Sequence, residues 1–198
     1  MKKNLKLALI VVATTNLLMA NMVFNLGAQH FSNSIDGNFT DSTYDLPKTV
    51  VSTSLKLENG HYIPKESGSF KVELKEPKTK WGVTFDMDCY LNTRGSGVTL
   101  LGKDGNVLTL FFSNGEISVN GQVKKNSSFR YGKKIVGTLQ SDAKVITVII
   151  NGKYNFKIEK PNFNLGYIEV NLGTDTYNSS KFFPDKLNGL AITTASKE

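Results

Sequence analysis

The sequence predicts an all-β protein, an antiparallel β-sandwich that follows an N-terminal signal peptide helix. Two observations predict the sandwich. The segment Lys80–Leu91 alternates apolar and polar residues over its whole length, which is the period of a half-buried strand. Short segments rich in β-branched residues are separated by Asn-Gly and Asp-Gly pairs, which favour two-residue hairpin turns. No apolar period of 3.6 residues persists beyond the N-terminus, so no helix is expected there.

Residues 1–28 have the composition of a secretory signal peptide. Three lysines among the first six residues precede an apolar run from Leu7 to Ala20, which is short and interrupted for a membrane span. Cleavage is expected after Ala28, and Ala20 is the other position with a suitable small residue. An uncleaved anchor or a buried N-terminal helix is the alternative. Cleavage predicts a secreted, extracellular protein with no stable membrane insertion after processing.

The rest of the chain is expected to hold one domain. Residues 29–48 are polar and turn-prone, and Pro47 is unsuited to a central strand, so they are interpreted as a lead-in. Residues 49–198 form the β-sandwich domain. The single cysteine, Cys89, lies on the apolar face of the central segment and excludes an intrachain disulfide. The hydrophobic core alone must therefore provide stability.

The charge balance argues against a nucleic-acid partner. The formal net charge of +7 falls to +4 without the three leader lysines, and only two of the 24 basic residues are arginine. Dedicated readers of phosphates and bases favour the arginine guanidinium group, because its planar fork binds them in a bidentate manner.

The first strands are expected on both sides of a tight turn. The segment Thr49–Leu57 is rich in β-branched residues, and Asn59-Gly60 is a hairpin turn. The strand resumes at His61–Ile63 and is expected to end at Pro64, because proline cannot donate a ladder hydrogen bond. Residues 70–75 alternate apolar and charged side chains and are expected to form the strand before the central segment.

A meander of antiparallel strands is expected after the central strand. Segments with strand patterns occupy residues 98–101, 106–112, 116–119, 135–139, 145–150, 154–158, 167–172 and 187–194, and turn pairs lie at Asp104-Gly105, Asn114-Gly115, Asn120-Gly121 and Asn151-Gly152.

A resemblance to a known fold rests on the strand Trp81–Leu91, the run Gly105–Gly115 and the hairpin Val145–Ile158. In layout they resemble the concanavalin A-like lectin and glucanase superfamily, jelly-roll sandwiches that include laminin G-like modules. The closing segment Phe182–Ile192 is similar to the final core strand of such domains. The resemblance extends over roughly Thr49–Thr194 and implies a jelly roll more than it implies a function.

Two carboxylates share the polar face of the central strand. Asp86 and Asp88 are two residues apart, which places their Cα atoms ~6.5 Å from each other, and glycoside hydrolases use paired carboxylates. One glucanase branch of the superfamily carries Glu-x-Asp-x-Glu on such a strand, with the outer residues as nucleophile and acid/base. The string here is Asp86-Met87-Asp88-Cys89-Tyr90, so tyrosine replaces the acid/base. No catalytic residue is therefore assigned.

The same strand end offers a candidate ligand site, which consists of Asp86, Asp88, Tyr90, Asn92 and Arg94. A tyrosine ring can stack on sugar, and the other side chains can bind hydroxyl groups. Tyr90, Asn92 and Arg94 also have the chemistry of a polysaccharide lyase, although no family motif surrounds them. The alternative is a solvated strand face.

A basic cluster between residues 124 and 134 is the second candidate site. Its basic and aromatic members include Lys124, Lys125, Arg130, Tyr131, Lys133 and Lys134, and it contains no acidic residue. Such a segment can hold an anionic polymer by charge attraction and ring contacts. The alternative is a solvated connection kept soluble by lysine.

These patterns favour a secreted, non-enzymatic β-sandwich that binds carbohydrate or an anionic cell-surface polymer. No metal or other cofactor is expected, because the acidic residues are dispersed and His30 and His61 lie far apart in the sequence. Two alternatives remain open. One is a glycan-active enzyme, either a glycosidase or a polysaccharide lyase, and the other is an adhesive surface module that binds protein.

Overall fold

The computed structural model describes residues 20–26, 49–89, 97–113, 116–125, 133–160, 162–173 and 185–195, which form thirteen strands and no helix. The strands are β1 (Ala20–Leu26), β2 (Thr49–Glu58), β3 (His61–Lys78), β4 (Lys80–Cys89), β5 (Gly97–Gly102), β6 (Val107–Ser113), β7 (Glu116–Val119), β8 (Gln122–Lys125), β9 (Lys133–Asp142), β10 (Val145–Ile150), β11 (Tyr154–Glu159), β12 (Leu165–Gly173) and β13 (Lys186–Ala195). The predicted all-β class is confirmed. No helix of these residues is both long and apolar enough to span a membrane.

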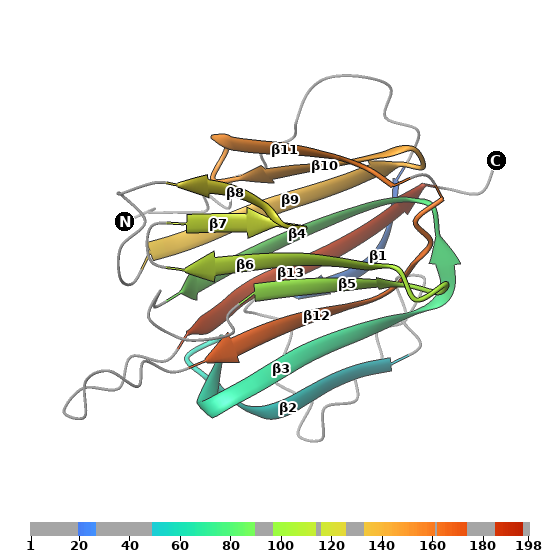
Figure 1. Cartoon of the computed structure of the whole chain (residues 1–198). Helices are drawn as coiled ribbons and strands as arrows, with labels where there is room; N and C mark the ends of the chain where they lie inside the picture. Colours follow the sequence, from blue (N-terminus) through green and yellow to red (C-terminus); the bar gives the residue numbers. More distant parts are fainter. Residues whose placement is uncertain are drawn as a thin grey trace, which may run out of the picture.

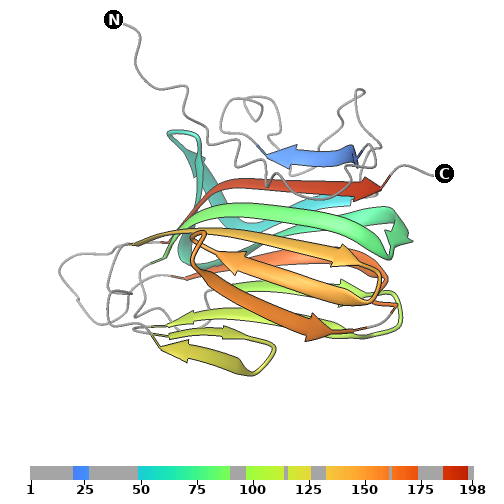
Figure 2. The same ribbon diagram turned by 90° about the horizontal axis from the view of Figure 1, so that it is seen from above.

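The strands form two facing layers, as Figures 1 and 2 show. The hydrogen-bonded order is β11-β10-β9-β4-β13-β3-β12-β5-β6-β7-β8, with β1 on β13 and β2 on β3. We call the layer of β4, β9, β10, β11 and β13 the back sheet, and the layer of β5 to β8 and β12 the front sheet. Every recorded strand pairing is antiparallel, so the predicted antiparallel sandwich is confirmed.

The central strand has the predicted two faces. Side chains of Trp81, Val83, Phe85, Met87 and Cys89 are all buried, and the residues between them are partly or fully exposed. The front sheet covers the buried face, since the rings of Phe85 and Phe112 on β6 lie 6.0 Å apart. Alternation in the sequence therefore identified the core side of β4 correctly. Leu91 lies outside the described residues.

Three of the predicted Asn-Gly hairpin turns are confirmed. Both residues of Asn59-Gly60, Asn120-Gly121 and Asn151-Gly152 have positive φ angles, as a type I′ turn requires. Asparagine and glycine adopt this conformation at low cost, and its twist matches that of the flanking strands. Asn114-Gly115 lies outside the described residues.

The prediction that Pro64 ends a strand is wrong, because β3 continues through it to Lys78. Pro64 pairs with Leu55 next to a register shift in β2, where Ser54 has a φ angle of 55°. Proline is accommodated at such an irregular position because no regular ladder bond is required of its nitrogen. Here β3 leaves β13, with which it pairs only through Tyr62, and continues as the partner of β12.

The predicted leader is described only at its C-terminal end. Ala20–Leu26 forms β1, which pairs with residues 190–195 of β13. Residues 1–19 and 27–48 lie outside the described residues. The signal peptide 1–28, the lead-in 29–48 and the domain boundary at residue 49 therefore stay predictions.

Candidate functional site

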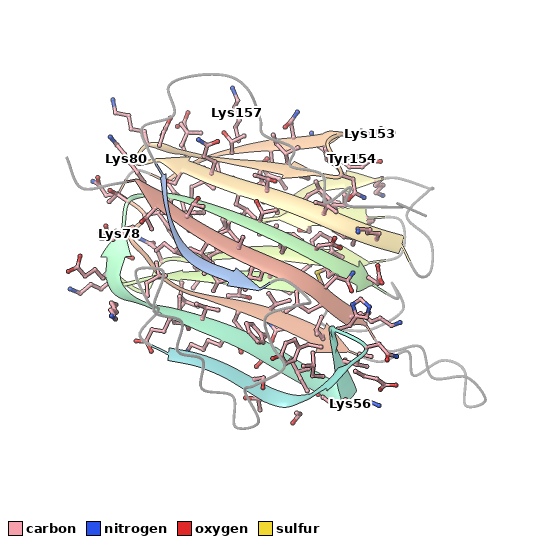
Figure 3. All side chains as sticks on the ribbon, turned by 180° about the vertical axis from the view of Figure 1, so that it is seen from behind. Lys56, Lys78, Lys80, Lys153, Tyr154 and Lys157 are labelled. Carbon is pink, nitrogen blue, oxygen red and sulfur yellow. The ribbon has the colours of Figure 1, made fainter. Side chains whose placement is uncertain are left out.

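The candidate site lies on the face of the back sheet that points away from the core. Asp86 and Asp88 are partly exposed on this outer face, as the alternation in β4 predicted. β13 lies on one side of β4 and β9 on the other. Figure 3 views the molecule from this side and shows the three strands next to one another. The site is at the end of β4 opposite to Lys80.

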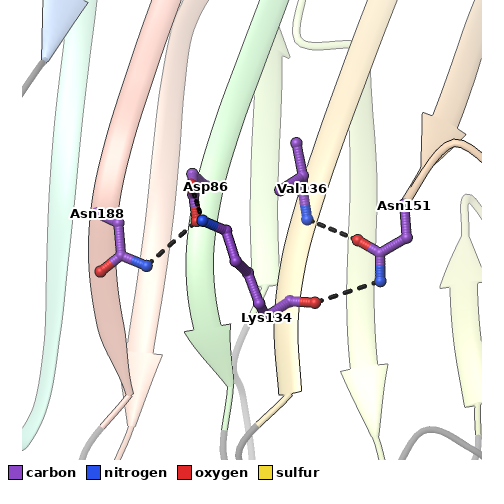
Figure 4. Close-up of polar contacts among 5 residues, drawn as sticks. All are labelled: Asp86, Lys134, Val136, Asn151 and Asn188. Carbon is purple, nitrogen blue, oxygen red and sulfur yellow. Dashed lines mark hydrogen bonds and ion pairs between the residues drawn. The ribbon is translucent and has the colours of Figure 1, made fainter. Parts of the chain in front are cut away.

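The carboxylate of Asp86 contacts side chains from both neighbouring strands (Figure 4). Its Oδ2 atom lies 2.7 Å from Nζ of Lys134 on β9, and its Oδ1 atom accepts a hydrogen bond of 3.1 Å from Nδ2 of Asn188 on β13. A charge-assisted contact on one oxygen and an amide contact on the other hold the carboxylate in a single orientation. Three adjacent strands therefore converge on Asp86.

Asn188 reaches Asp86 because β13 is irregular at this position. Met87 pairs with Leu187 and Asp86 pairs with Gly189, so Asn188 is an extra residue between two regular pairs. A β-bulge of this kind redirects a side chain and is common next to functional sites. The glycine that follows Asn188 adapts easily to the irregular backbone.

The start of β9, which carries Lys134, is fixed by the turn at Asn151. Oδ1 of Asn151 accepts a hydrogen bond of 2.7 Å from the backbone nitrogen of Val136, and its Nδ2 donates to the carbonyl oxygen of Lys134 at 3.2 Å. The backbone nitrogen of Asn151 also donates to the carbonyl oxygen of Val136 at 2.7 Å. The backbone of Lys134 is therefore held in place on the side opposite to Asp86.

Charges of both signs lie around the site. Asp88, the second predicted carboxylate, pairs in register with Lys186 of β13 and with Lys134 of β9. The described side chains on the outer face at this end of the three strands thus include two aspartates and two lysines.

The other predicted ligand residues, Tyr90, Asn92 and Arg94, lie outside the described residues, because β4 is described only to Cys89. Their place in the site stays a prediction. The strand ends that flank the undescribed segments lie side by side, since Cys89 pairs with Lys133 and Asp88 pairs with Lys186.

The described lysines of the basic cluster do not share one surface. Lys124 and Lys125 lie in the strand β8, at the start of a segment for which a solvated connection was the alternative to a polymer site. Nζ of Lys124 donates to the carbonyl oxygen of Asn155 on β11 and lies 4.8 Å from the centre of the Phe156 ring. Nζ of Lys125 lies 3.9 Å from a carboxylate oxygen of Glu116, and Lys134 belongs to the Asp86 site. Arg130, Tyr131 and the side chain of Lys133 lie outside the described residues.

Sequence reasoning missed two features of this site. Lys134 was assigned to the basic cluster rather than to Asp86, because no sequence pattern links residues 48 positions apart. Asn188 was not considered as a site residue. A glycine inside a strand pattern indicates a bulge, so the Asn188-Gly189 pair could have drawn attention to it.

Among the described residues, no group of three or more histidine, cysteine, aspartate or glutamate side chains is placed to hold a metal ion. The expectation that no metal is required stays a prediction.

Comparisons with known proteins identify the fold. No protein-family model matches the sequence, and no curated protein sequence matches it. The CBM2 module of the evolved Dit of Lactobacillus casei BL23 phage J-1 aligns with a TM-score of 0.57 and 11% identity, over 90% of this chain and 98% of that chain. A Bacillus licheniformis β-glucanase aligns with a TM-score of 0.57 and 12% identity, over 90% of this chain and 100% of that chain.

A third solved structure belongs to work on endo-acting O-glycanases that members of the human gut microbiota express to initiate mucin breakdown. It aligns with a TM-score of 0.56 and 11% identity, over 72% of this chain and 83% of that chain. At such identities the similarity establishes the fold alone. The protein has the concanavalin A-like jelly-roll fold, as the resemblance in strand layout predicted.

Proposed function

We propose that this protein is a non-enzymatic module that binds carbohydrate through the outer face of its back sheet. The observation that carries the proposal is the convergence of Lys134, Asp86 and Asn188 from three adjacent strands. Sugar hydroxyl groups both donate and accept hydrogen bonds, and this set offers an ammonium donor, a carboxylate acceptor and an amide. Because the three groups are already bonded to one another, little side-chain entropy is lost on binding.

The fold is compatible with this role. Both a CBM2 module and a β-glucanase align with nearly the whole chain. Fold similarity alone does not assign a function, so the proposal rests on the polar site and treats the fold as support.

The alternative is a glycan-active enzyme that uses Asp86, Asp88 and Tyr90. Glycoside hydrolysis passes through a transition state with positive charge on the sugar, which carboxylates stabilise. Nζ of Lys134 lies 2.7 Å from Asp86 and offsets the negative charge available for this purpose. In addition, Tyr90 stands at the position that the acid/base glutamate occupies in the Glu-x-Asp-x-Glu motif. Both observations favour binding over hydrolysis.

An anionic polymer is a less suitable ligand than a neutral glycan. The described lysines of the basic cluster contact Asn155, Glu116 and Asp86, which lie in different parts of the sandwich. A polymer would need a continuous row of lysines whose charge is not offset by neighbouring carboxylates. A protein ligand, the third possibility, would make binding to cells independent of their glycans.

A glycan array with the purified protein tests the proposal. We expect binding to a defined set of glycans, and we expect Asp86→Ala to weaken it at least tenfold. Gln140→Ala is the matched control, because Gln140 is exposed on β9, pairs with Gly82 and lies away from Asp86. Equal binding by Asp86→Ala and wild type would place the site elsewhere. Release of reducing sugar from a bound glycan would favour the enzyme.

We also infer that the protein is exported, from the leader composition described above. Recovery of the protein from the culture medium of an expressing bacterium is the expected result. If all of the protein stayed in the cell fraction, this result would contradict export.

A further inference from the structure

The strand register places His61 opposite Asn188, at the border of the candidate site. Tyr62 of β3 pairs with Leu187 of β13, and the strands are antiparallel, so His61 is opposite Asn188. Tyr62 and Leu187 are core residues, at 7% and 1% exposure. Neighbouring positions in a strand point to opposite faces, so His61 belongs to the outer face, where Asn188 contacts Asp86.

Two polar atoms at this position are buried without a hydrogen-bond partner among the described residues. They are Nδ1 of His61 and Oδ1 of Asn188. Leaving such an atom unpaired is unfavourable, so native proteins normally satisfy it with water or a ligand. Both atoms therefore lack a hydrogen-bond partner that a small polar group could supply.

The orientation of the Asn188 amide follows from its contact with Asp86. The carboxylate only accepts hydrogen bonds, so the amide group that faces it must be the Nδ2 donor. Oδ1 therefore points away from Asp86 and is an acceptor. His61 can supply a donor at Nδ1, either in one neutral tautomer or when protonated. A group between these atoms must donate to Asn188 and accept from His61.

A hydroxyl group satisfies both conditions, because it has one donor hydrogen and accepting lone pairs. We propose that His61 and Asn188 bind one hydroxyl group of a neutral sugar, while Asp86 and Lys134 bind an adjacent hydroxyl group of the same ring. This assignment rests on the proposed carbohydrate-binding function. It makes His61 a specificity-determining residue for a vicinal diol.

The charges at the site favour a neutral sugar over a uronic or sulfated one. Asp86 is ion-paired with Lys134, and the register places Asp88 opposite Lys186. Each of the two lysines therefore has a carboxylate nearby. An anionic sugar that paired with Lys134 would have to displace Asp86 from it, so one ion pair would replace another with no net gain.

The experiment starts from the neutral glycan that gives the strongest array signal and measures its affinity by calorimetry. We expect His61→Ala to weaken binding at least tenfold. His61→Asn should restore most of the affinity, since the asparagine Nδ2 is attached to Cγ, as Nδ1 is in histidine. Gln140→Ala should change the affinity less than twofold. Thermal unfolding of each variant checks that it is folded, and His61→Asn keeps the test valid if His61→Ala does not fold.

Deoxy analogues of the same glycan test the proposed contact. Removing the hydroxyl group bound by His61 should weaken binding to wild type at least tenfold and should have no further effect on His61→Ala. The inference is overturned if His61→Ala and wild type bind equally while Asp86→Ala does not bind, and the proposed function then stands. It is also overturned if a crystal structure of the complex shows a water molecule on both atoms and the sugar elsewhere. Absence of any array signal overturns the proposed function and the inference together.

Discussion

The aromatic ring of Phe85 occupies the space where Gly137 of the neighbouring strand would carry a side chain. The two residues are paired in register between β4 and β9. A Cβ atom on Gly137 would lie 2.1 Å from Cζ of Phe85, far inside van der Waals contact. Gly137 is therefore needed for the ring to pack against Phe112 of the front sheet. The contact therefore lies between β4 and β9, the two strands that carry Asp86 and Lys134.

We expect Gly137→Ala to lower the free energy of unfolding by ~1 to 3 kcal/mol, since the added methyl group overpacks the core. Gly166→Ala is the matched control, because its Cβ would lie 3.4 Å or more from all neighbours. Urea denaturation of both variants checks the prediction. Equal midpoints for the two variants would show that Phe85 moves aside at no cost.

Trp81 is expected to be the most costly truncation on β4. Its side chain is 3% exposed, its ring centre lies 5.9 Å from that of Phe163, and Nε1 donates to the Phe163 carbonyl oxygen at 3.4 Å. Trp81→Ala should lower the free energy of unfolding by ~3 to 5 kcal/mol through the cavity that it leaves. Trp81→Phe should cost less, because one ring remains. A loss below ~1 kcal/mol for Trp81→Ala would contradict the core assignment.

Cys89 is expected to make stability depend on pH in the alkaline range. Burial raises the pKa of its thiol well above the ordinary value, and the nearby charges of Asp185 and Asp88 raise it further. The unfolded chain loses the thiol proton above about pH 8.5, while the folded chain still holds it. The unfolded state then binds fewer protons, so the free energy of unfolding falls as pH rises.

Wild type should therefore lose more stability between neutral pH and pH 10 than Cys89→Ala, which has no thiol to titrate. Chemical denaturation at several pH values measures the difference between the two slopes. Parallel curves for the two proteins would contradict the raised pKa. Native Cys89 should also resist thiol reagents until the protein is unfolded, because the thiolate is the reactive form.

Local patterns predicted the strands well, and long-range pairing accounts for what they missed. The alternation in β4 identified its core face, and Asn59-Gly60 and Asn151-Gly152 identified hairpins, because these signals depend on neighbouring residues. Asn188 lies 102 positions from Asp86, and no local signal brings them together. The bend of β3 at Pro64 is likewise set by the two layers that the strand joins.

For the same reason, the sequence predicted only part of the candidate site. The sequence placed Asp86 and Asp88 on one polar face, since strand periodicity determines that face. It assigned Lys134 to a separate cluster, although the pairing of β9 with β4 brings Lys134 to Asp86. It gave His61 no role, although the pairing of β3 with β13 places His61 opposite Asn188. Tyr90, Asn92 and Arg94 remain predictions.

The final prediction concerns β1, which the predicted leader supplies. Residues 20–26 pair with β13 from Leu190 to Ala195, and β3 pairs with β13 only at Leu187. Cleavage after Ala20, the alternative position, would keep Asn21–Leu26, whereas cleavage after Ala28 would remove all of β1. Without β1, this edge of β13 would expose unpaired backbone groups, which promote association of sheet edges.

We expect a chain that begins at Asn21 to be more stable than one that begins at Gln29. Each added backbone hydrogen bond contributes ~0.5 to 1.5 kcal/mol, and ordering the strand offsets most of this gain. A net gain of about 1 kcal/mol raises the melting temperature by ~2 to 4 °C for a domain of this size. Asn25→Pro in the longer chain is the control, because proline removes a backbone donor from β1 and should abolish the gain. The same melting temperature for the two chains would show that β1 adds no stability, and an exported chain whose intact mass begins at Gln29 would show that β1 is removed.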